Sequence, residues 1–207
     1  GWLYIGENWT GSSSNIRVKK FRIYNRVLNP SEISALYNEV DLASGLVAHY
    51  PLATNSLDIS GNGYNGTDTA ITYSSGSAVF NGSTSLINTS TATALDAGNS
   101  FTASVWVNMS AYPIINAVNA MSKLTLWSQG WMLYTDNSNK YSFFGYWLPT
   151  TLVTEANTYS LSTWYNYVIT YDGATLKIYR DNVLVGSQAS VGTITPSATD
   201  FKFGFYN

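Results

Sequence analysis

The run of residues 164–187, WYNYVITYDGATLKIYRDNVLVGS, limits the fold more than any other stretch of the sequence. Residues 164–171 place apolar or β-prone side chains at both alternating sets of positions, which is typical of a strand covered on both faces. The Asp-Gly pair at 172–173 and the Asp-Asn pair at 181–182 tolerate the backbone angles of tight reversals. The run therefore predicts three antiparallel strands joined as a meander.

Residues 29–40 carry the pattern of a helix. Asn29, Pro30 and Glu32 stand where a capping side chain, a first-turn proline and the glutamate of a capping box belong. Apolar side chains then follow at i, i+3, i+4 and i+7 and give one apolar face. The residues of this face are Ile33, Leu36, Tyr37 and Val40. We expect one short helix here and strands elsewhere.

Composition favours a β domain with an uncharged surface. The chain has 207 residues, of which 45% are hydrophobic and 15% aromatic, enough for a large core and for additional aromatic rings on a binding face. Only 11% of the residues are charged, so neutral hydroxyl and amide groups must solvate most of the surface. This composition is common in extracellular β proteins.

Charge and residue types exclude several classes of protein. The net charge is −2 and the basic residues are scattered, which does not favour nucleic-acid binding. The sequence has no cysteine, so disulfides, cysteine-ligated zinc and thiol chemistry are excluded. No apolar run approaches the roughly 20 residues that a membrane span needs. We expect an extracellular location, at a cell or virion surface, without membrane insertion.

The meander is similar to the signature of laminin G-like domains, which are concanavalin A-like jelly rolls of a lectin/glucanase superfamily. The matching features are Trp164, the Tyr-Asp-Gly turn at 171–173, Leu176, Tyr179 and the Val-Leu-Val run at 183–185. Residues 45–52 resemble the opening strand of the same family, and residues 58–66 resemble the glycine-rich loop that follows it. Residues 78–82 resemble the next strand and turn, and residues 100–107 resemble a central strand. The resemblance implies an all-β, two-sheet antiparallel jelly-roll sandwich with one short helix.

The order of these segments is permuted relative to the family. Residues 1–40 resemble the closing strands and helix of a laminin G-like domain, whereas residues 45–207 resemble its main body. Residues 201–204 and residues 3–6 resemble the same family strand. Three arrangements are open: a piece of a tandem array cut out of phase, a circular permutation with residues 1–40 folding back in cis, or residues 1–40 that complete a neighbouring copy.

A glycine-rich loop contains a candidate calcium site. Asp58, Asn62 and Asn65 offer oxygen ligands at short intervals, which suits a hard cation such as Ca²⁺. The resemblance implies that such a loop can hold structural calcium. The alternative is a loop in which Asp58 accepts hydrogen bonds from backbone N–H groups, as in an Asx turn.

Aromatic residues in the middle of the chain are candidates for sugar binding. Exposed rings can stack on sugar faces while amide and carboxyl groups bind hydroxyls, although aromatics at alternating positions usually belong to a sandwich core. The candidates are Trp127, Trp131, Tyr134, Asp136, Tyr146 and Trp147.

Catalysis is not expected. Glycoside hydrolysis generally needs a pair of carboxylates, and none of the four glutamates has an aspartate two positions away on a predicted strand. His49 lies in the segment that resembles the opening strand, where we expect it to pack.

These observations predict a non-catalytic extracellular binding or adhesion module of a repetitive surface protein. A glycan or a surface protein is the expected partner, and neighbouring copies of the chain are a further one. The alternative is a structural subunit of a filament, fibre or surface layer, assembled by exchange of residues 1–40 between copies.

Overall fold

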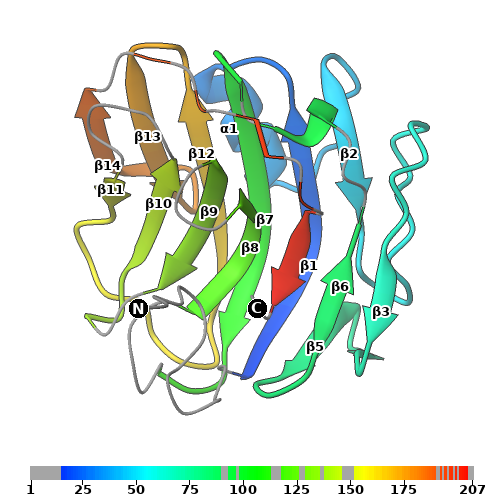
Figure 1. Cartoon of the computed structure of the whole chain (residues 1–207). Helices are drawn as coiled ribbons and strands as arrows, with labels where there is room; N and C mark the ends of the chain where they lie inside the picture. The colour runs from blue at the N-terminus through cyan, green and yellow to red at the C-terminus, as the bar shows by residue number, and fades with distance from the viewer. Residues whose placement is uncertain are drawn as a thin grey trace, which may run out of the picture.

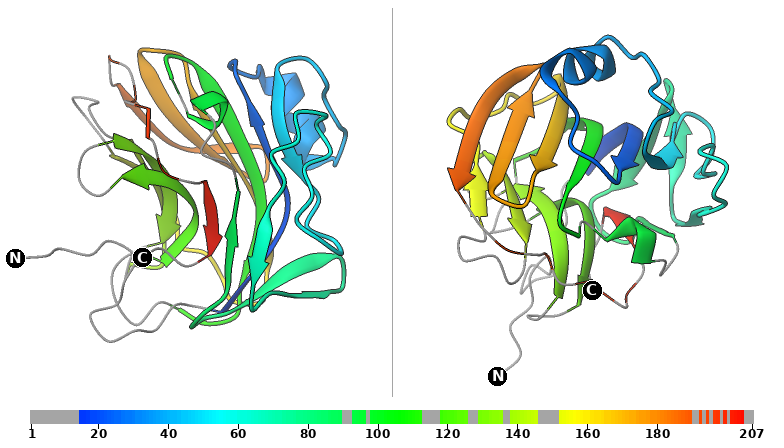
Figure 2. Two further views of the ribbon diagram at one scale, coloured as in Figure 1. Left: turned by 45° about the vertical axis from the view of Figure 1, so that its right-hand side comes forward. Right: turned by 90° about the horizontal axis from the view of Figure 1, so that it is seen from above.

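The computed structural model describes residues 15–89, 93–96, 98–112, 118–125, 129–135, 138–145, 152–189, 192, 194, 196–197, 199 and 201–204. These residues form two antiparallel sheets that face each other, as Figure 1 and the left view of Figure 2 show. The predicted all-β jelly-roll sandwich is therefore confirmed.

The first sheet, sheet A, follows the order β14-β13-β12-β7-β1-β5-β4, with β2 paired to β1 as well. Its strands are β1 (Asn15–Tyr24), β2 (Leu46–Tyr50), β4 (Thr72–Ser74), β5 (Ser77–Asn81), β7 (Phe101–Met109), β12 (Trp164–Tyr171), β13 (Thr175–Arg180) and β14 (Val183–Ala189).

The second sheet, sheet B, follows the order β11-β10-β9-β8-β15-β6-β3. Its strands are β3 (Thr67–Thr69), β6 (Leu86–Asn88), β8 (Val118–Thr125), β9 (Gln129–Thr135), β10 (Tyr141–Gly145), β11 (Leu152–Thr154) and β15 (Lys202–Gly204). One 3-10 turn, η1 (Thr93–Leu95), precedes β7.

The meander predicted for residues 164–187 is present as β12, β13 and β14, which pair in sequence order. Gly173 has a φ of 88° in the first turn, a conformation that glycine adopts without steric cost. Asp181 and Asn182 have φ values of 51° and 67° in the second turn. The turn chemistry in the sequence therefore located both reversals correctly.

Strand β1 lies in the interior of sheet A. It pairs with β7 along one side, while its other side pairs with β5 through residues 15–18 and with β2 through residues 21–24. The irregularity between these two halves includes Lys20, whose φ is 52° and whose N–H donates to the carbonyl of Pro51 at 2.9 Å. Residues 15–40 thus pack in one sandwich with the strands of residues 46–204. Residues 1–14 lie outside the described residues, and the division into 1–40 and 45–207 stays a prediction.

Phe21 of β1 is at the centre of an aromatic cluster between the sheets. Its ring centroid lies 4.9 Å from that of Phe201 and 5.0 Å from that of Phe203. Tyr50 stacks on it at 5.9 Å. All four side chains are fully buried, so the core joins strands from both ends of the described chain.

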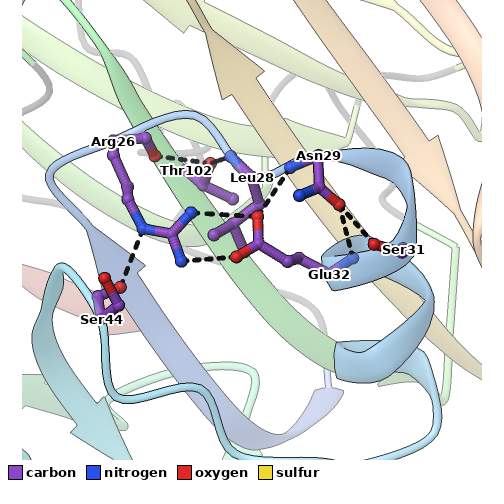
Figure 3. A network of polar contacts seen from close by, with 7 residues as sticks. All are labelled: Arg26, Leu28, Asn29, Ser31, Glu32, Ser44 and Thr102. Atoms are coloured by element: carbon purple, nitrogen blue, oxygen red, sulfur yellow. Dashed lines mark hydrogen bonds and ion pairs between the residues drawn. The ribbon is translucent and has the colours of Figure 1, made fainter.

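Helix α1 (Pro30–Tyr37) covers one end of the outer face of sheet A, as the right view of Figure 2 shows. Its start has the predicted capping box: Asn29 Oδ1 accepts from the N–H of Glu32 at 3.0 Å, and Glu32 Oε2 accepts from the N–H of Asn29 at 2.9 Å (Figure 3). The Glu32 carboxylate also pairs with Arg26 at 2.7 Å, and Arg26 donates to the carbonyl of Ser44 (Figure 3). The polar network therefore fixes where the helix begins.

The apolar face of the helix is shorter than predicted. Ile33 and Leu36 are buried against Tyr24 and Val168 of sheet A. Val40 is 50% exposed, because the helix ends at Tyr37 and Glu39 adopts a left-handed conformation with a φ of 63°. Within the described part of the chain, no helix has the length and apolar character to span a membrane.

A first prediction tests whether β1 completes the sandwich of its own chain. Phe21→Ala should lower the free energy of unfolding by about 3–5 kcal/mol, as expected when a fully buried phenyl group is lost. Val40→Ala in the same segment should change it by less than about 0.5 kcal/mol, because Val40 is half exposed. Chemical denaturation measures both.

The wild-type melting temperature should also be the same in dilute and concentrated solution, because the segment comes from the same chain. A melting temperature that rises with protein concentration would contradict this, since it would mean that a second copy supplies the segment.

Candidate functional site

Five strands of sheet A place one row of side chains on its outer face. Thr72, Val79, Arg17, Asn108 and Trp164 are successive cross-strand partners from β4 through β5, β1 and β7 to β12. Their neighbours along these strands include Ile16, Val18, Phe80, Val107 and Met109, which point into the core. Because side chains alternate between faces, the row points away from the core.

A groove lies at the β4 end of this row. Its volume is about 460 Å³, and its lining residues are Asn15, Ile16, Arg17, Thr72, Ser74, Val79, Phe80, Asn81 and Ser110. Arg17 is fixed within it, because its Nε donates to Ser77 Oγ at 3.1 Å and its Nη2 donates to the carbonyl of Ser74. The groove therefore offers amide, hydroxyl and guanidinium groups beside an apolar floor.

Two indole rings lie at the other end of the row. The Lys19 ammonium is 5.0 Å from the ring centroids of both Trp106 and Trp164. Tyr37 of α1 stacks on Trp106 with a centroid distance of 5.7 Å and an interplanar angle of 17°. Lys19 also pairs with Glu39 at 3.3 Å. The ammonium group is therefore held both by the two indole rings and by the Glu39 carboxylate.

We call Asn15, Arg17, Thr72, Ser74, Val79, Asn81 and Ser110 of the groove, together with Lys19, Trp106, Asn108 and Trp164, the outer strip. Partly exposed indole rings can stack on flat apolar surfaces, and the neighbouring polar groups can orient a ligand by hydrogen bonds. A carbohydrate presents both kinds of surface. None of the strip residues was among those predicted to bind sugar.

The structure separates the predicted sugar-binding residues. Tyr134 is on β9 in sheet B and is partly exposed. Trp127, Asp136, Tyr146 and Trp147 lie outside the described residues. As a set, these five residues stay a prediction.

Trp131 is a correction to the predicted set. Its side chain is fully buried, its ring lies 5.5 Å from Phe201 and 5.9 Å from Phe143, and its Nε1 donates to the carbonyl of Leu95 at 3.3 Å. A ring enclosed in this way cannot stack on a sugar. The strand alternation of β9 directs Trp131 and Leu133 to the core, a choice of face that the sequence did not specify.

The loop predicted to hold calcium is closed by its own hydrogen bonds. Asp58 Oδ1 accepts from the N–H groups of His49 and Ser60, both at 2.9 Å. Asp58 Oδ2 accepts from Ser60 Oγ at 2.9 Å and from the N–H of Tyr64 at 3.1 Å. The carboxylate is thus used as the Asx-turn alternative describes.

The two asparagines are engaged in the same loop. Asn65 Oδ1 accepts from the N–H of Asp58 at 3.0 Å, while the Asn62 amide nitrogen donates to the carbonyl of Val47 at 2.8 Å. This arrangement does not fit a cation held by these three side chains. Within the described residues, no three acidic, histidine or cysteine side chains gather into a metal-binding group. Calcium binding stays a prediction.

Glu155 is a buried carboxylate that joins the two sheets. It accepts from the N–H of Tyr141 at 2.8 Å, from Tyr167 Oη at 3.0 Å and from Arg180 Nη1 at 2.9 Å. Burial raises the pKa of this carboxyl, and the Tyr141 N–H and the Arg180 charge offset only part of that effect. Because Glu155 is 1% exposed and both its oxygens are bonded, its role is structural.

Three further acidic or histidine side chains of the described residues are also engaged or buried. Glu39 and Asp41 follow α1, where Glu39 pairs with Lys20 and Asp41 pairs with Arg22. His49 is buried, and burial, followed by the charge of Arg22, lowers its pKa to about 4. His49 is therefore neutral at pH 7.

A second prediction concerns the Asp58 loop. Asp58→Asn should destabilise the protein by about 1–3 kcal/mol, because an amide cannot accept all four hydrogen bonds that the carboxylate accepts. The loss should be equal in calcium and in chelator. A wild-type melting temperature that rises with calcium, and a variant in which it does not, would instead support the cation site.

A third prediction concerns the pH dependence that Glu155 contributes. Its pKa is raised in the folded state, so its stabilising contribution is complete below its usual pKa and decreases as the pH rises through the folded-state pKa. The free energy of unfolding of the wild type minus that of Glu155→Gln should therefore fall from pH 4.5 upward. Urea titrations across this range measure the difference, and a rise with pH would contradict the raised pKa.

Comparisons with known proteins agree with this architecture. A family model described as the concanavalin A-like lectin/glucanases superfamily matches residues 81–205. The binding domain of botulinum neurotoxin DC, solved in complex with SialylT, is a structural neighbour with a TM-score of 0.52 and 15% sequence identity. The match covers 73% of this chain and 40% of the neurotoxin chain. Because the sequence identity is low, the match shows a shared fold and no more. No curated protein sequence matches the chain. By the family match, the chain belongs to the concanavalin A-like lectin/glucanase superfamily.

Proposed function

We propose that the chain is a non-catalytic carbohydrate-binding module and that the outer strip of sheet A is its binding face. The observation that carries the proposal is the cross-strand row in which the partly exposed Arg17 and Trp164 lie on either side of Asn108, which is 8% exposed. The row joins a polar groove to an indole platform. This is the combination that recognises a ring with one apolar face and a rim of hydroxyls.

The family and its structural neighbour support the same class of function. The superfamily includes lectins by its description, and the neurotoxin binding domain was solved in complex with SialylT. At 15% identity, that neighbour supports the two-sheet scaffold and not a particular set of contact residues.

The composition of the outer strip supports binding without catalysis. None of the named strip residues carries a carboxyl group, so the strip lacks the pair of carboxylates that glycoside hydrolysis generally uses. Glu39 reaches the strip only as the ion-pair partner of Lys19. A bound sugar would therefore meet donors, amides and rings.

The surroundings and partners are part of the proposal. The low share of charged residues, 11%, supports a location outside the cell or at a cell or virion surface. The permuted order of the family segments supports a larger repetitive protein as the parent. A glycan is the partner that the outer strip fits best, and a surface protein that carries glycans would present the same chemistry. The residues predicted around Tyr134 in sheet B form a second, competing surface.

A fourth prediction distinguishes the two surfaces. The wild type should bind glycans on an array, and Trp164→Ala should weaken the strongest interaction at least tenfold, which corresponds to about 1.4 kcal/mol. Tyr134→Ala should leave the affinity unchanged. Calorimetric titration of the array hits, with melting curves to show that each variant is folded, provides the measurement.

Two results would contradict the proposal. An array without any hit, in calcium and in chelator, would count against carbohydrate binding itself. Loss of binding in Tyr134→Ala with full binding in Trp164→Ala would place the site on sheet B.

A further inference from the structure

Arg17 is a cation of the groove that has no anionic partner. Its Nε donates to Ser77 Oγ at 3.1 Å and its Nη2 donates to the carbonyl of Ser74, and both acceptors are neutral. Among the described residues, Nη1 has no hydrogen-bond partner and the side chain forms no ion pair. The positive charge of Arg17 is therefore not compensated within the described part of the chain.

The surroundings of Arg17 add positive charge. The residues that line the groove include no acidic side chain. Next to Arg17 in β1, Lys19 and Lys20 share the single carboxylate of Glu39. Three cations thus face one carboxylate in this part of β1, although the chain as a whole has a net charge of −2. A locally positive groove on an acidic protein favours a ligand with negative charge.

The Arg17 guanidinium is held in place before any ligand arrives. Its two bonds to the turn between β4 and β5 restrict the side chain, which lowers the entropy that binding costs. The N–H groups that these bonds leave unused lie on Nη1 and Nη2, at the terminal fork of the guanidinium. A carboxylate accepts two parallel hydrogen bonds from such a fork, and the oxygens of a sulfate ester can do the same.

The other end of the groove presents neutral polar groups. Ser77 precedes Ala78, the partner of Val18, whereas Asn15 pairs with Asn81, so the two ends lie on opposite sides of Arg17 along β1. The carbonyl of Asn15 accepts from the N–H of Ser110 at 2.9 Å. The side chains of Asn15 and Ser110 are exposed and form no hydrogen bond with a described residue. An amide and a hydroxyl are thus available to bind the hydroxyl groups of a sugar.

We propose that the outer strip takes an acidic sugar, whose carboxylate or sulfate group pairs with the Nη1/Nη2 fork of Arg17. The inference rests on the proposed carbohydrate-binding function and narrows it to one class of ligand. Asn15 and Ser110 bind hydroxyl groups at the other end of the groove. Lys19 contributes less to the preference for an acid, because Glu39 already pairs with it.

Matched pairs of sugars test this proposal with the full chain. Each pair differs only in the acidic group: oligosaccharides that end in glucuronic acid or glucose, in galacturonic acid or galactose, in N-acetylneuraminic acid or its carboxyl amide, and in 6-sulfated or unsulfated galactose. The first three pairs report a carboxylate, and the fourth reports a sulfate. In calorimetric titrations, the acidic member of at least one pair should bind about tenfold more tightly than its neutral partner. This preference should weaken as the salt concentration rises.

Variants of Arg17 show whether this side chain carries the preference. Arg17→Met should lower the affinity for the acidic sugar more than that for the neutral one, so that the two differ by less than about threefold. Arg17→Lys keeps the charge but lacks the fork, and it should retain only part of the preference. Melting curves show that each variant is folded.

Lys177→Met is the matched control for the loss of one positive charge. Lys177 lies between the core residues Leu176 and Ile178 of β13, so it points to the same outer face of sheet A as Arg17. It is partly exposed, forms no ion pair with a described residue and does not belong to the outer strip. Lys177→Met should therefore leave the affinities of both members of each pair unchanged.

The possible failures are distinguishable. If the wild type binds both members of every pair equally well, the acidic sugar is overturned while carbohydrate binding stands. A preference for the acidic member that Arg17→Met retains in full would also overturn the proposal, because another group would then recognise the acid. If neither acidic nor neutral sugars bind, the proposed function itself fails, and this inference fails with it.

Discussion

The pairing of β1 with three other strands is the interaction on which the rest of the structure depends. One strand of ten residues provides a partner for β7 on one side and for β5 and β2 on the other. It also carries Phe21, on which Tyr50, Phe201 and Phe203 converge. Without this strand, β7 would have an unpaired edge, and the aromatic rings of sheet B would face water.

Local patterns in the sequence predicted the parts of the fold that depend on neighbouring residues. The turns at 172–173 and 181–182 and the capping box at Asn29 are set by residue types a few positions apart, and the structure has them all. The end of the helix was predicted less well, because the left-handed Glu39 has no clear signal in the sequence. The fold class followed from the order of such patterns and their resemblance to one family.

The outer strip could not be predicted in the same way. Its row joins Thr72, Arg17, Asn108 and Trp164, which are far apart in sequence and meet only through strand register. Trp131 shows the same limit. Side chains of a strand alternate between the two faces of its sheet, and only the packing of the other sheet determines which face, and therefore which aromatic residue, is buried. The one sequence signal that bears on the strip is the alternation of Lys19 and Arg17 with apolar residues in β1.

The polar groups elsewhere mostly hold the fold together. Asp58 closes a loop, Glu155 joins the sheets, and the buried Lys123 pairs with Asp96 at 3.2 Å and donates to the carbonyl of Ser197. Arg17 and Lys19 of the outer strip are also engaged within the chain, with Ser77 and Glu39. The strip differs in that these two side chains and the rings of Trp106 and Trp164 are partly exposed on the outer face of sheet A, which is why binding is assigned to it.

Amide hydrogen exchange across β1 tests the central claim, that this strand is an interior part of its own chain's sandwich. The account predicts that amides of residues 16–24 exchange as slowly as those of β7 and that their protection is the same at low and high protein concentration. Exchange in β1 that is much faster than in β7, or protection that grows with concentration, would contradict it.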